Sequence, residues 1–388
     1  MNHEIHVGSS LPPGWDAFSL GSKASFVTSG SRGWARFYSE SGDLFLRSQN
    51  IRSGHLDLED RQHVLPPAGA EGERTRVQPN DLLVTITGNS VGNVAISSDD
   101  LGIAYISQHV GMIRLVNPSL APYACWYLSP GAPGNRQIMD AQTGQSKPGL
   151  NLQNLKDLVV AAPKDKRERD LIVAALEDIQ AQADEMQILL SKKRMLKQAA
   201  MQELLTSKRR LPGFDGEWEV KRLVDVAPLQ RGFDLPNPKL EDGPYPVVYS
   251  NGVMNHHAAF QVKGPGVVTG RSGTIGKVHY VANDFWPHNT SLWVTNFRGN
   301  DPKFIFYLLS SMGIERFASG SGVPTLNRND LHNQSIRIPS ETREQVAIAA
   351  VLTDLDTNLD ATNQQLAKAS ALKQGMMQQL LTGLIRLQ

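Results

Sequence analysis

Two long segments of this chain repeat one another, and this repeat limits the folds that the chain can adopt. Residues 150–179 read LNLQNLKDLVVAAPKDKRERDLIVAALEDI, and residues 326–355 read LNRNDLHNQSIRIPSETREQVAIAAVLTDL. The segments align without a gap at an offset of 176 residues (326 minus 150), and the alignment continues to residues 211 and 387. Because the paired prolines Pro163 and Pro339 stay in register, we interpret the chain as a duplication.

The repeat extends towards the N-terminus of each copy with small insertions and deletions. Trp15 in LPPGW has its counterpart at Trp218 in GEW. Two further stretches align: Gly88–Val94 with Ser272–Val278, and Gln108–His109 with Pro287–His288. Each copy therefore consists of a variable globular part followed by a better-matched helical segment.

The matched segments predict two long helices. Each begins after a proline and carries acidic residues in its first turn, as helix starts do. Apolar residues then recur in alternating steps of four and three, which is typical of a coiled-coil seam. The predicted seam residues are Ile172, Leu176, Ile179, Met186, Leu190, Ile348, Leu352, Leu355, Leu359 and Leu366.

The seam slips near Leu196 and Leu372, which indicates a stutter. About 40 helical residues give a rod of about 60 Å, which cannot bury an apolar stripe alone. We expect the second helix to cover the first. A globular segment separates the two helices, which favours an antiparallel intramolecular coiled coil related by a pseudo-twofold axis.

The globular parts predict a mixed α/β fold. Asp81–Thr87 and Gly266–Gly270 read as strands that end in glycine-rich turns, and Tyr123–Leu128 and Phe304–Leu309 read as short buried helices. The expected layout is a first globular domain at 1–164, a long helix at 165–210, a second globular domain at 211–339 and a long helix at 340–388.

Composition excludes several classes of protein. The formal net charge is +1, so no global basic excess marks a nucleic-acid-binding protein. One cysteine, Cys125, excludes a disulfide framework and a cysteine-rich metal cluster, and we expect it to be a buried thiol. No stretch approaches the roughly 20 apolar residues of a membrane helix, and no signal peptide is evident. We expect a soluble, cytoplasmic protein.

Familiar catalytic motifs are missing from the sequence. Gly270–Lys277 superficially resembles a phosphate-binding loop, but Val278 follows where Ser or Thr is required. No nucleophile elbow, HExxH pair or dinucleotide fingerprint occurs. The adjacent His256 and His257 are best interpreted as loop or surface residues rather than metal ligands. We therefore expect a non-catalytic chain that binds neither a metal nor a cofactor itself.

Glycine-flanked loops rich in guanidinium and amide groups are the remaining candidates for function. Arginine pairs with guanine and Gln or Asn with adenine, while Ser, Thr and Lys hold phosphates. We predict DNA contacts for Arg32, Arg36, Arg47, Gln49, Asn50, Asn89 and Ser90 in the first domain, and for Arg231, Asn251, Arg271, Thr274, Lys277 and Asn289 in the second.

The whole arrangement resembles the specificity (S) subunit of type I restriction–modification enzymes. The resemblance rests on Gly-x-x-x-Pro-x-Leu-Asn at 144–151 and 320–327, the helix-opening Pro163 and Pro339, and Met-Gln-x-Leu-Leu-Thr at 201–206 and 377–382. It implies that each globular part is a target-recognition domain reading one half of a bipartite, asymmetric DNA site, as in phage defence, while the helices set the spacer.

The resemblance also implies partners. Two methyltransferase (modification) subunits would dock on the helices and bring S-adenosylmethionine. Restriction/translocase subunits would bring ATP and Mg²⁺. The alternative from the residues alone is a coiled-coil adaptor whose two domains bind proteins, since a duplication and a coil fit that function equally well. A self-sufficient enzyme is a third, weaker alternative.

Overall fold

The computed structural model describes residues 11–66, 69–142, 149–320 and 322–388. The chain divides into two compact units. Unit 1 comprises residues 1–186 and 365–388, and unit 2 comprises residues 187–364. Both boundaries fall inside long helices, α6 (Lys166–Leu204) and α10 (Thr342–Leu380), so each helix contributes one part to each unit. The mixed α/β class expected from the sequence is confirmed.

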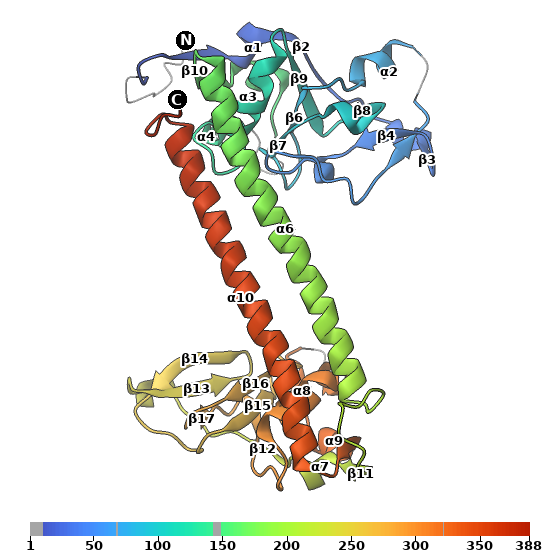
Figure 1. Ribbon diagram of the computed structural model, residues 1–388, viewed down its shortest axis with the longest axis vertical. Coiled ribbons are helices and arrows are strands. Elements are labelled where there is room, and N and C mark those ends of the chain that lie inside the picture. Colours follow the sequence, from blue (N-terminus) through green and yellow to red (C-terminus); the bar gives the residue numbers. More distant parts are fainter. Residues whose placement is uncertain (1–10, 67–68, 143–148, 321) are drawn as a thin grey trace. The chain divides into compact units, whose positions relative to one another are not determined.

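Unit 1 contains three sheets (Figure 1). A two-stranded sheet pairs β1 (Trp15–Ser19) with β10 (Val159–Pro163). A four-stranded antiparallel sheet has the order β2 (Ala24–Ser29), β9 (Val110–Leu115), β6 (Leu82–Thr85) and β7 (Val94–Ile96). The third sheet has the order β3 (Tyr38–Ser39), β5 (His63–Val64), β4 (Asp43–Leu46) and β8 (Ala104–Ile106).

Short helices complete unit 1. The α-helices are α1 (Leu20–Lys23), α2 (Ala70–Thr75), α3 (Ala121–Leu128), α4 (Asn135–Asp140) and α5 (Leu152–Asp157). The 3₁₀ helices are η1 (Trp34–Phe37), η2 (Ser48–Asn50), η3 (Asp99–Leu101) and η4 (Pro118–Leu120). The short helix expected at Tyr123–Leu128 is α3.

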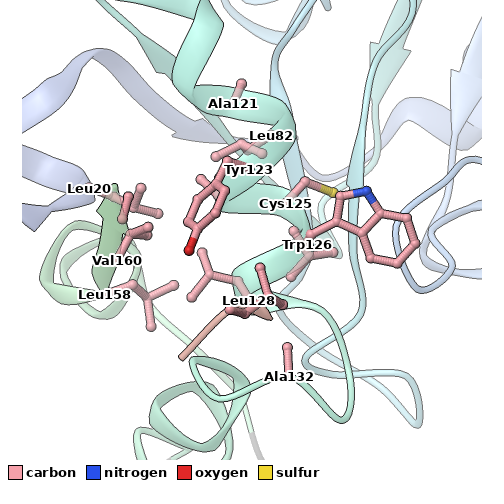
Figure 2. Close-up of a cluster of buried hydrophobic side chains, with 14 of the residues drawn as sticks. Leu20, Leu82, Ala121, Tyr123, Cys125, Trp126, Leu128, Ala132, Leu158 and Val160 are labelled. Carbon is pink, nitrogen blue, oxygen red and sulfur yellow. The ribbon is translucent and has the colours of Figure 1, made fainter. Parts of the chain in front are cut away.

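The main core of unit 1 joins the sheets to both long helices. Side chains of α3 pack in one cluster with Ile172 and Leu176 of α6 and with Met377 and Leu380 of α10. Figure 2 shows Tyr123, Cys125 and Trp126 projecting from α3 into this cluster. Cys125 is 1% exposed, as expected of a buried thiol, and burial raises its pKa to about 12.

Unit 2 repeats this plan with its own elements. The paired strands are β11 (Trp218–Arg222) and β21 (Ser335–Pro339). The four-stranded sheet has the order β12 (Leu229–Arg231), β18 (Ser291–Val294), β15 (Gly266–Gly270) and β16 (Val278–Val281). A further sheet has the order β14 (Gly252–His257), β13 (Tyr245–Tyr249) and β17 (Trp286–Pro287), and β19 (Ala318–Ser319) pairs with β20 (Thr325–Leu326).

The short helices of unit 2 are α7 (Leu223–Val226), α8 (Pro302–Ser311), α9 (Arg328–His332), η5 (Asn237–Lys239) and η6 (Ile314–Phe317). The helix expected at Phe304–Leu309 is α8, which packs in one cluster with Ile348 and Leu352 of α10.

The strand pairs that close each unit match residue by residue. Trp15 lies opposite Pro163, and Trp218 lies opposite Pro339. The predicted correspondence of the two tryptophans is therefore confirmed. Asn151 and Asn327 occupy equivalent N-cap positions, where each side chain accepts a backbone N–H of the following short helix. The repeated asparagine is thus explained by the four orphan N–H groups that every helix start presents.

Within each unit the two long helices run antiparallel. In unit 1, Glu168 of α6 binds Arg386 beyond the end of α10, and Gln180 further along α6 accepts a hydrogen bond from Lys373, earlier in α10. In unit 2, Lys193 of α6 donates to Thr362 of α10, whereas Arg210 beyond the end of α6 binds Glu344 near the start of α10. In both units residue numbers rise along one helix as they fall along the other.

Burial along the helices follows the heptad pattern unevenly. Ile172, Leu176, Ile179, Leu190, Ile348, Leu352 and Leu359 are buried, whereas Met186, Leu355 and Leu366 are half-buried. Leu196 and Leu372, where the pattern slips, have nearly equal exposed fractions of 58% and 57%. A side chain at the slip is rotated out of the apolar stripe, as a stutter requires.

Both helices end earlier than the ranges 165–210 and 340–388 expected from the sequence. α6 ends at Leu204 and α10 at Leu380. Ser207 and Gly383, which are equivalent at the 176-residue offset, both have positive φ (59° and 72°) and reverse the chain. The reversal lets Arg210 and Arg386 bind the buried carboxylates of Glu344 and Glu168, with each guanidinium 5.9 Å from a tryptophan ring.

The backbone hydrogen bonds correct two of the looser alignments. Ile86 N donates to His109 O at 2.9 Å, and Arg271 N donates to Thr290 O at 2.8 Å. His109 therefore corresponds to Thr290 rather than to His288. By the same pairing Thr87 corresponds to Ser272, so Gly88 corresponds to Gly273 rather than to Ser272. The sequence alignment slipped because unit 2 has one residue fewer between this turn and the next strand.

Candidate DNA-reading surface

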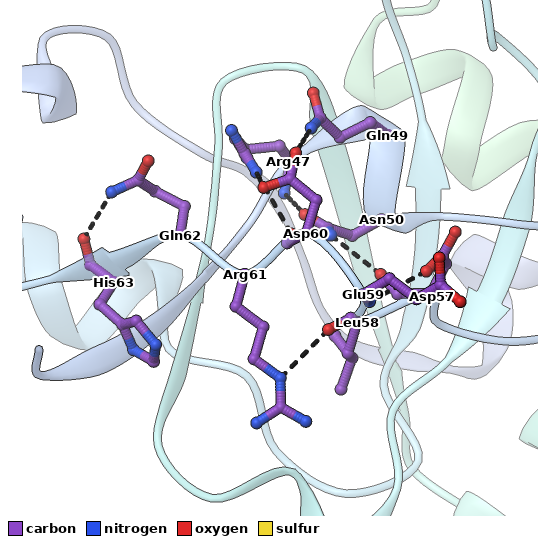
Figure 3. A network of polar contacts seen from close by, with 10 residues as sticks. All are labelled: Arg47, Gln49, Asn50, Asp57, Leu58, Glu59, Asp60, Arg61, Gln62 and His63. Atoms are coloured by element: carbon purple, nitrogen blue, oxygen red, sulfur yellow. Dashed lines mark hydrogen bonds and ion pairs between the residues drawn. The ribbon is translucent and has the colours of Figure 1, made fainter. Parts of the chain in front are cut away.

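The predicted polar residues after β4 form one connected network in unit 1 (Figure 3). Asp60 lies at its centre, and its side chain is 67% exposed. One carboxylate oxygen of Asp60 pairs with Arg47 Nη2 at 3.0 Å, and the other accepts a hydrogen bond from Gln49 Nε2. A single carboxylate thus holds a guanidinium and a carboxamide side by side on the surface; we call these three residues the Asp60 clamp.

Asn50 belongs to the framework of this loop. Its side chain accepts the backbone N–H of Arg47 at 2.9 Å and donates to the carbonyl oxygens of Asp57 and Asp60 at 2.9 and 3.0 Å. Asn50 is 2% exposed. Because these hydrogen-bonding groups are used inside the loop, the Asn50 side chain holds the loop that carries Arg47 and Gln49.

A second ion pair stiffens the same loop. Arg52 contacts one carboxylate oxygen of Asp57 through Nε and Nη2, at 3.1 and 3.0 Å. The backbone N–H of Glu59 and then the guanidinium of Arg52 lower the pKa of Asp57. Asp57 therefore stays ionised and keeps its ion pair with Arg52. This pair helps to hold the loop that carries Asp60.

Arg32 precedes η1, Arg36 lies within it, and both are exposed. Arg36 lies over the ring of Phe37 at 4.7 Å. Between the two arginines, Trp34 is 2% exposed and stacks on Phe45 at a centroid distance of 5.2 Å. A buried aromatic cluster therefore supports two guanidinium groups that face solvent.

Asn89 and Ser90 lie in the turn between β6 and β7, where Asn89 is exposed and Ser90 is half-buried. Thr87, just before this turn, hydrogen-bonds through its hydroxyl to His109 Nδ1, and Gln108 hydrogen-bonds to Nε2 of the same ring at 3.0 Å. The turn is thus joined to the segment before β9.

Unit 2 contains a similar clamp, in which one aspartate holds an arginine and an asparagine instead of an arginine and a glutamine. Asp234 Oδ1 pairs with Arg231 Nη2 at 2.8 Å and accepts a hydrogen bond from Asn289 Nδ2. The Asp234 side chain is 64% exposed. We call Arg231, Asp234 and Asn289 the Asp234 clamp. Two of the predicted contacts, Arg231 and Asn289, are therefore brought together by a carboxylate that the sequence analysis did not single out.

The other predicted residues of unit 2 surround this clamp or lie beyond it. Arg271 Nη1 donates to Asn289 O at 3.4 Å, which links Arg271 to the clamp. Thr274 is half-buried and Lys277 is exposed, both in the turn between β15 and β16. Asn251 is exposed in the turn between β13 and β14, and its amide contacts Met254 Sδ at 3.5 Å.

The two units place different side chains at equivalent backbone positions. Ser107 N donates to Leu46 O at 2.8 Å in unit 1, and His288 N donates to Val248 O at 2.9 Å in unit 2. These bonds align the residues that follow Leu46 with those that follow Val248. The resulting pairs are Arg47 with Tyr249, Gln49 with Asn251, and Gln108 with Asn289; the turn alignment adds Asn89 with Thr274.

Tyr249 and His288 replace the arginine of unit 1 with an aromatic pair. Their ring centroids are 4.2 Å apart. Burial lowers the pKa of His288, and the charge of Asp234 opposes that shift. The His288 ring is therefore predominantly neutral at pH 7. Because Tyr249 occupies the position of Arg47, this part of unit 2 lacks the guanidinium that unit 1 has.

Asp60 and Asp234 are the residues of this surface that sequence reasoning missed. The spacing Arg231–Asp234 is short enough to have indicated an ion pair. Asp60 lies 13 residues from Arg47 (60 minus 47), and no local pattern connects them.

Within the described ranges no helix is long and apolar enough to cross a membrane.

Comparisons with known proteins agree with this architecture. Residues 215–371 match the family described as Type I restriction modification DNA specificity domain. Two curated Escherichia coli proteins are similar: the type I restriction enzyme EcoprrI specificity subunit is 28% identical over 114 residues, and the EcoBI specificity subunit is 26% identical over 145 residues. These alignments cover 29% and 37% of this chain, and only 28% and 30% of the two relatives.

Two solved structures share the fold over almost the whole chain. The type I restriction–modification S subunit from M. genitalium superposes with a TM-score of 0.67 at 15% identity, covering 94% of this chain and 96% of that one. A chain from a study of assembly and conformational transition of the type I R-M system superposes with a TM-score of 0.57 at 19% identity, covering 96% and 99%. The family match thus covers residues 215–371, and the shared fold extends over almost the whole chain.

Proposed function

We propose that this chain is the DNA-recognition subunit of a type I restriction–modification complex, with each unit reading one half of a bipartite site. The observation that carries the proposal is the shared backbone framework with different polar groups at equivalent positions. Where unit 1 has Arg47 and Gln49, unit 2 has Tyr249 and Asn251 at the equivalent positions. Different donors and acceptors read different bases, so the proposed target is asymmetric.

The Asp60 clamp provides side chains suited to base reading. When Gln49 donates one N–H to Asp60, its second N–H and its carbonyl oxygen remain, which is the donor–acceptor pair that adenine N7 and N6 require. The free edge of the Arg47 guanidinium suits guanine in the same way. Exposed hydroxyl and lysine side chains such as Lys277 suit phosphates, which fix position rather than sequence.

The long helices supply the rest of the proposed role. Two modification subunits would bind them and carry S-adenosylmethionine, and restriction/translocase subunits would carry ATP and Mg²⁺, so this chain would be non-catalytic. The description of the family that matches residues 215–371 refers to DNA specificity, which weighs against the protein-binding adaptor.

Methylome sequencing tests the proposal directly. Cells would express this chain with a cognate modification subunit, and N6-methyladenine would be mapped by single-molecule sequencing. We expect one bipartite motif with unlike halves and methylated adenines on opposite strands. Assembly of the complex without any methylated motif would contradict the proposal, and identical halves would contradict its asymmetry.

The proposed role of the helices as a spacer has its own test. Four residues would be inserted at equivalent points of α6 and α10, for example after Leu189 and after Gln365. The motif should keep both halves and gain a longer spacer, because the insertions lengthen both helices by about 6 Å. An unchanged spacer in a complex that still methylates DNA would refute this role.

A further inference from the structure

A pocket of about 340 Å³ in unit 2 is lined by three arginines. Arg231 ends β12, Arg271 follows β15, and Arg328 is the first residue of α9. The remaining lining residues are two buried leucines and a set of small polar side chains, namely Leu292, Leu326, Ser319, Thr325 and Asn327. Three elements that are distant in sequence therefore direct guanidinium groups to one cavity.

The backbone around the pocket is fixed by hydrogen bonds. Arg271 donates through its N–H to Thr290 O at 2.8 Å and accepts Leu326 N at its carbonyl oxygen at 2.8 Å. Asn327, directly before Arg328, caps α9 by accepting the N–H of Asn329 at 3.0 Å. The three arginines thus start from positions that the fold determines, which lowers the entropy lost when they bind a ligand together.

Positive charge at this pocket is only partly balanced. Arg231 pairs with Asp234, whose side chain is 64% exposed. Among the described residues no ion pair is formed by Arg271 or Arg328. The charge of Arg328 also acts on its surroundings, since after burial it is the next cause that lowers the pKa of His332. A pocket with three guanidinium groups and one adjacent carboxylate favours an anion.

Unit 1 has no arginine at the positions equivalent to the three arginines of this pocket. Leu150 N donates to Ile86 O at 2.9 Å, just as Leu326 N donates to Arg271 O, so Ile86 corresponds to Arg271. Leu152 follows the N-cap of α5 as Arg328 follows that of α9. Ser29 occupies the place of Arg231 in the four-stranded sheet. The framework therefore folds without these arginines, which indicates that they serve unit 2 alone.

We propose that the pocket formed by Arg231, Arg271 and Arg328 binds a phosphate group of the DNA backbone and anchors unit 2 on its half-site. This inference rests on the proposed function and adds a site to it. Guanidinium groups donate paired hydrogen bonds to phosphate oxygens. The hydroxyls of Ser319 and Thr325 donate to each other's backbone carbonyl oxygens at 3.5 and 3.3 Å and so hold this edge of the pocket. Such a contact adds affinity at any sequence and sets the register in which unit 2 meets the bases.

Arg328→Gln in the full-length chain is the test variant, because Arg328 is exposed and its loss should spare the fold. Its matched control is Arg298→Gln, an exposed arginine that follows the opposite end of β18. Duplex binding would be measured by fluorescence anisotropy across a KCl series. For Arg328→Gln we expect the salt slope to fall by about one and the affinity near 0.15 M salt to fall about 5-fold. The methylated motif of the complex should stay unchanged.

A second arm uses inorganic phosphate against chloride at constant ionic strength and needs no DNA. Phosphate should raise the melting temperature of the wild-type chain and of Arg298→Gln more than that of Arg328→Gln. If phosphate raises the melting temperature of the wild-type chain and of both variants equally, the proposed phosphate site is wrong. If Arg328→Gln relaxes one base pair while the salt slope holds, the pocket reads a base and the proposal is wrong. If phosphate binds but the wild-type chain shows no duplex binding, the proposed function fails while the anion site stands.

Discussion

Units 1 and 2 have the same framework and different surfaces. Trp15 and Trp218, the caps Asn151 and Asn327, and the order of the four-stranded sheets match between them. At the positions that face solvent the side chains differ, as the exposed Gln49 of unit 1 and the equivalent, exposed Asn251 of unit 2 show. Under the proposed function, folding and recognition therefore depend on different residues, and one can change while the other stays.

Leucines of the shared framework should give equal effects in the two units. Leu176 and Leu352 are equivalent at the 176-residue offset, and both are fully buried. Leu176→Ala and Leu352→Ala should each destabilise their own unit by about 2–5 kcal/mol, because each leaves a cavity. Hydrogen exchange followed by mass spectrometry would measure each unit separately. A large loss of stability from one variant and none from the other would show that the two leucines are not equivalent.

The clamps should affect specificity in one half-site only. Asp60→Asn removes the charge that holds Arg47 and Gln49, and discrimination at the half-site of unit 1 should weaken by about 1 kcal/mol. Asp60→Glu keeps the charge but shifts the carboxylate by one methylene, so it should weaken discrimination as well. Competition binding with single-base variants of the site measures both.

Asp99→Asn is the control for that experiment, since Asp99 is an exposed carboxylate of the same unit outside the clamp. It should change non-specific affinity without changing base preference. If Asp60→Glu behaves as wild type while Asp60→Asn does not, the carboxylate acts by charge alone. If both variants alter the half-site of unit 2, the units do not read independently.

As the pH falls, unit 2 should lose stability before unit 1 does. This loss should be smaller than the effects of the leucine and clamp variants. Burial lowers the pKa of His279, His288 and His332 below the usual value of 6.5, and all three lie in unit 2. The unfolded chain then binds more protons than the folded one. Stability is full above pH 6.5 and falls as the pH drops from there towards the lowered pKa values.

His332 is the most direct probe of this effect. Its Nε2 accepts the backbone N–H of Leu229 at 2.8 Å, which requires an unprotonated nitrogen. His332→Gln should reduce the loss of unit 2 stability between pH 7.5 and 5.5 by less than about 1 kcal/mol. Hydrogen exchange at the two pH values measures it. An unaltered pH dependence would remove His332 from the account.

Sequence analysis predicted the framework well because its signals are periodic or repeated. The proline-led helices, the paired tryptophans and the buried Cys125 follow from such patterns. The surface contacts were harder to predict, because they join residues that no local sequence pattern connects. Asn50 was predicted as a DNA contact, and no sequence pattern showed that its side chain also holds the loop of Asp60. The alignment of Gly88 with Ser272 failed by one residue, which only the bonds Ile86–His109 and Arg271–Thr290 reveal.

Cys125 gives this chain a chemical reporter of one unit. The sequence contains no other cysteine, and this thiol lies in the core of unit 1 with a pKa raised to about 12. A native chain should therefore resist alkylation at neutral pH, and any labelling must pass through an opened state of unit 1. The labelling rate of the unmodified protein measures that opening alone, so the stability of one half can be followed while the other binds, loses or exchanges its partners.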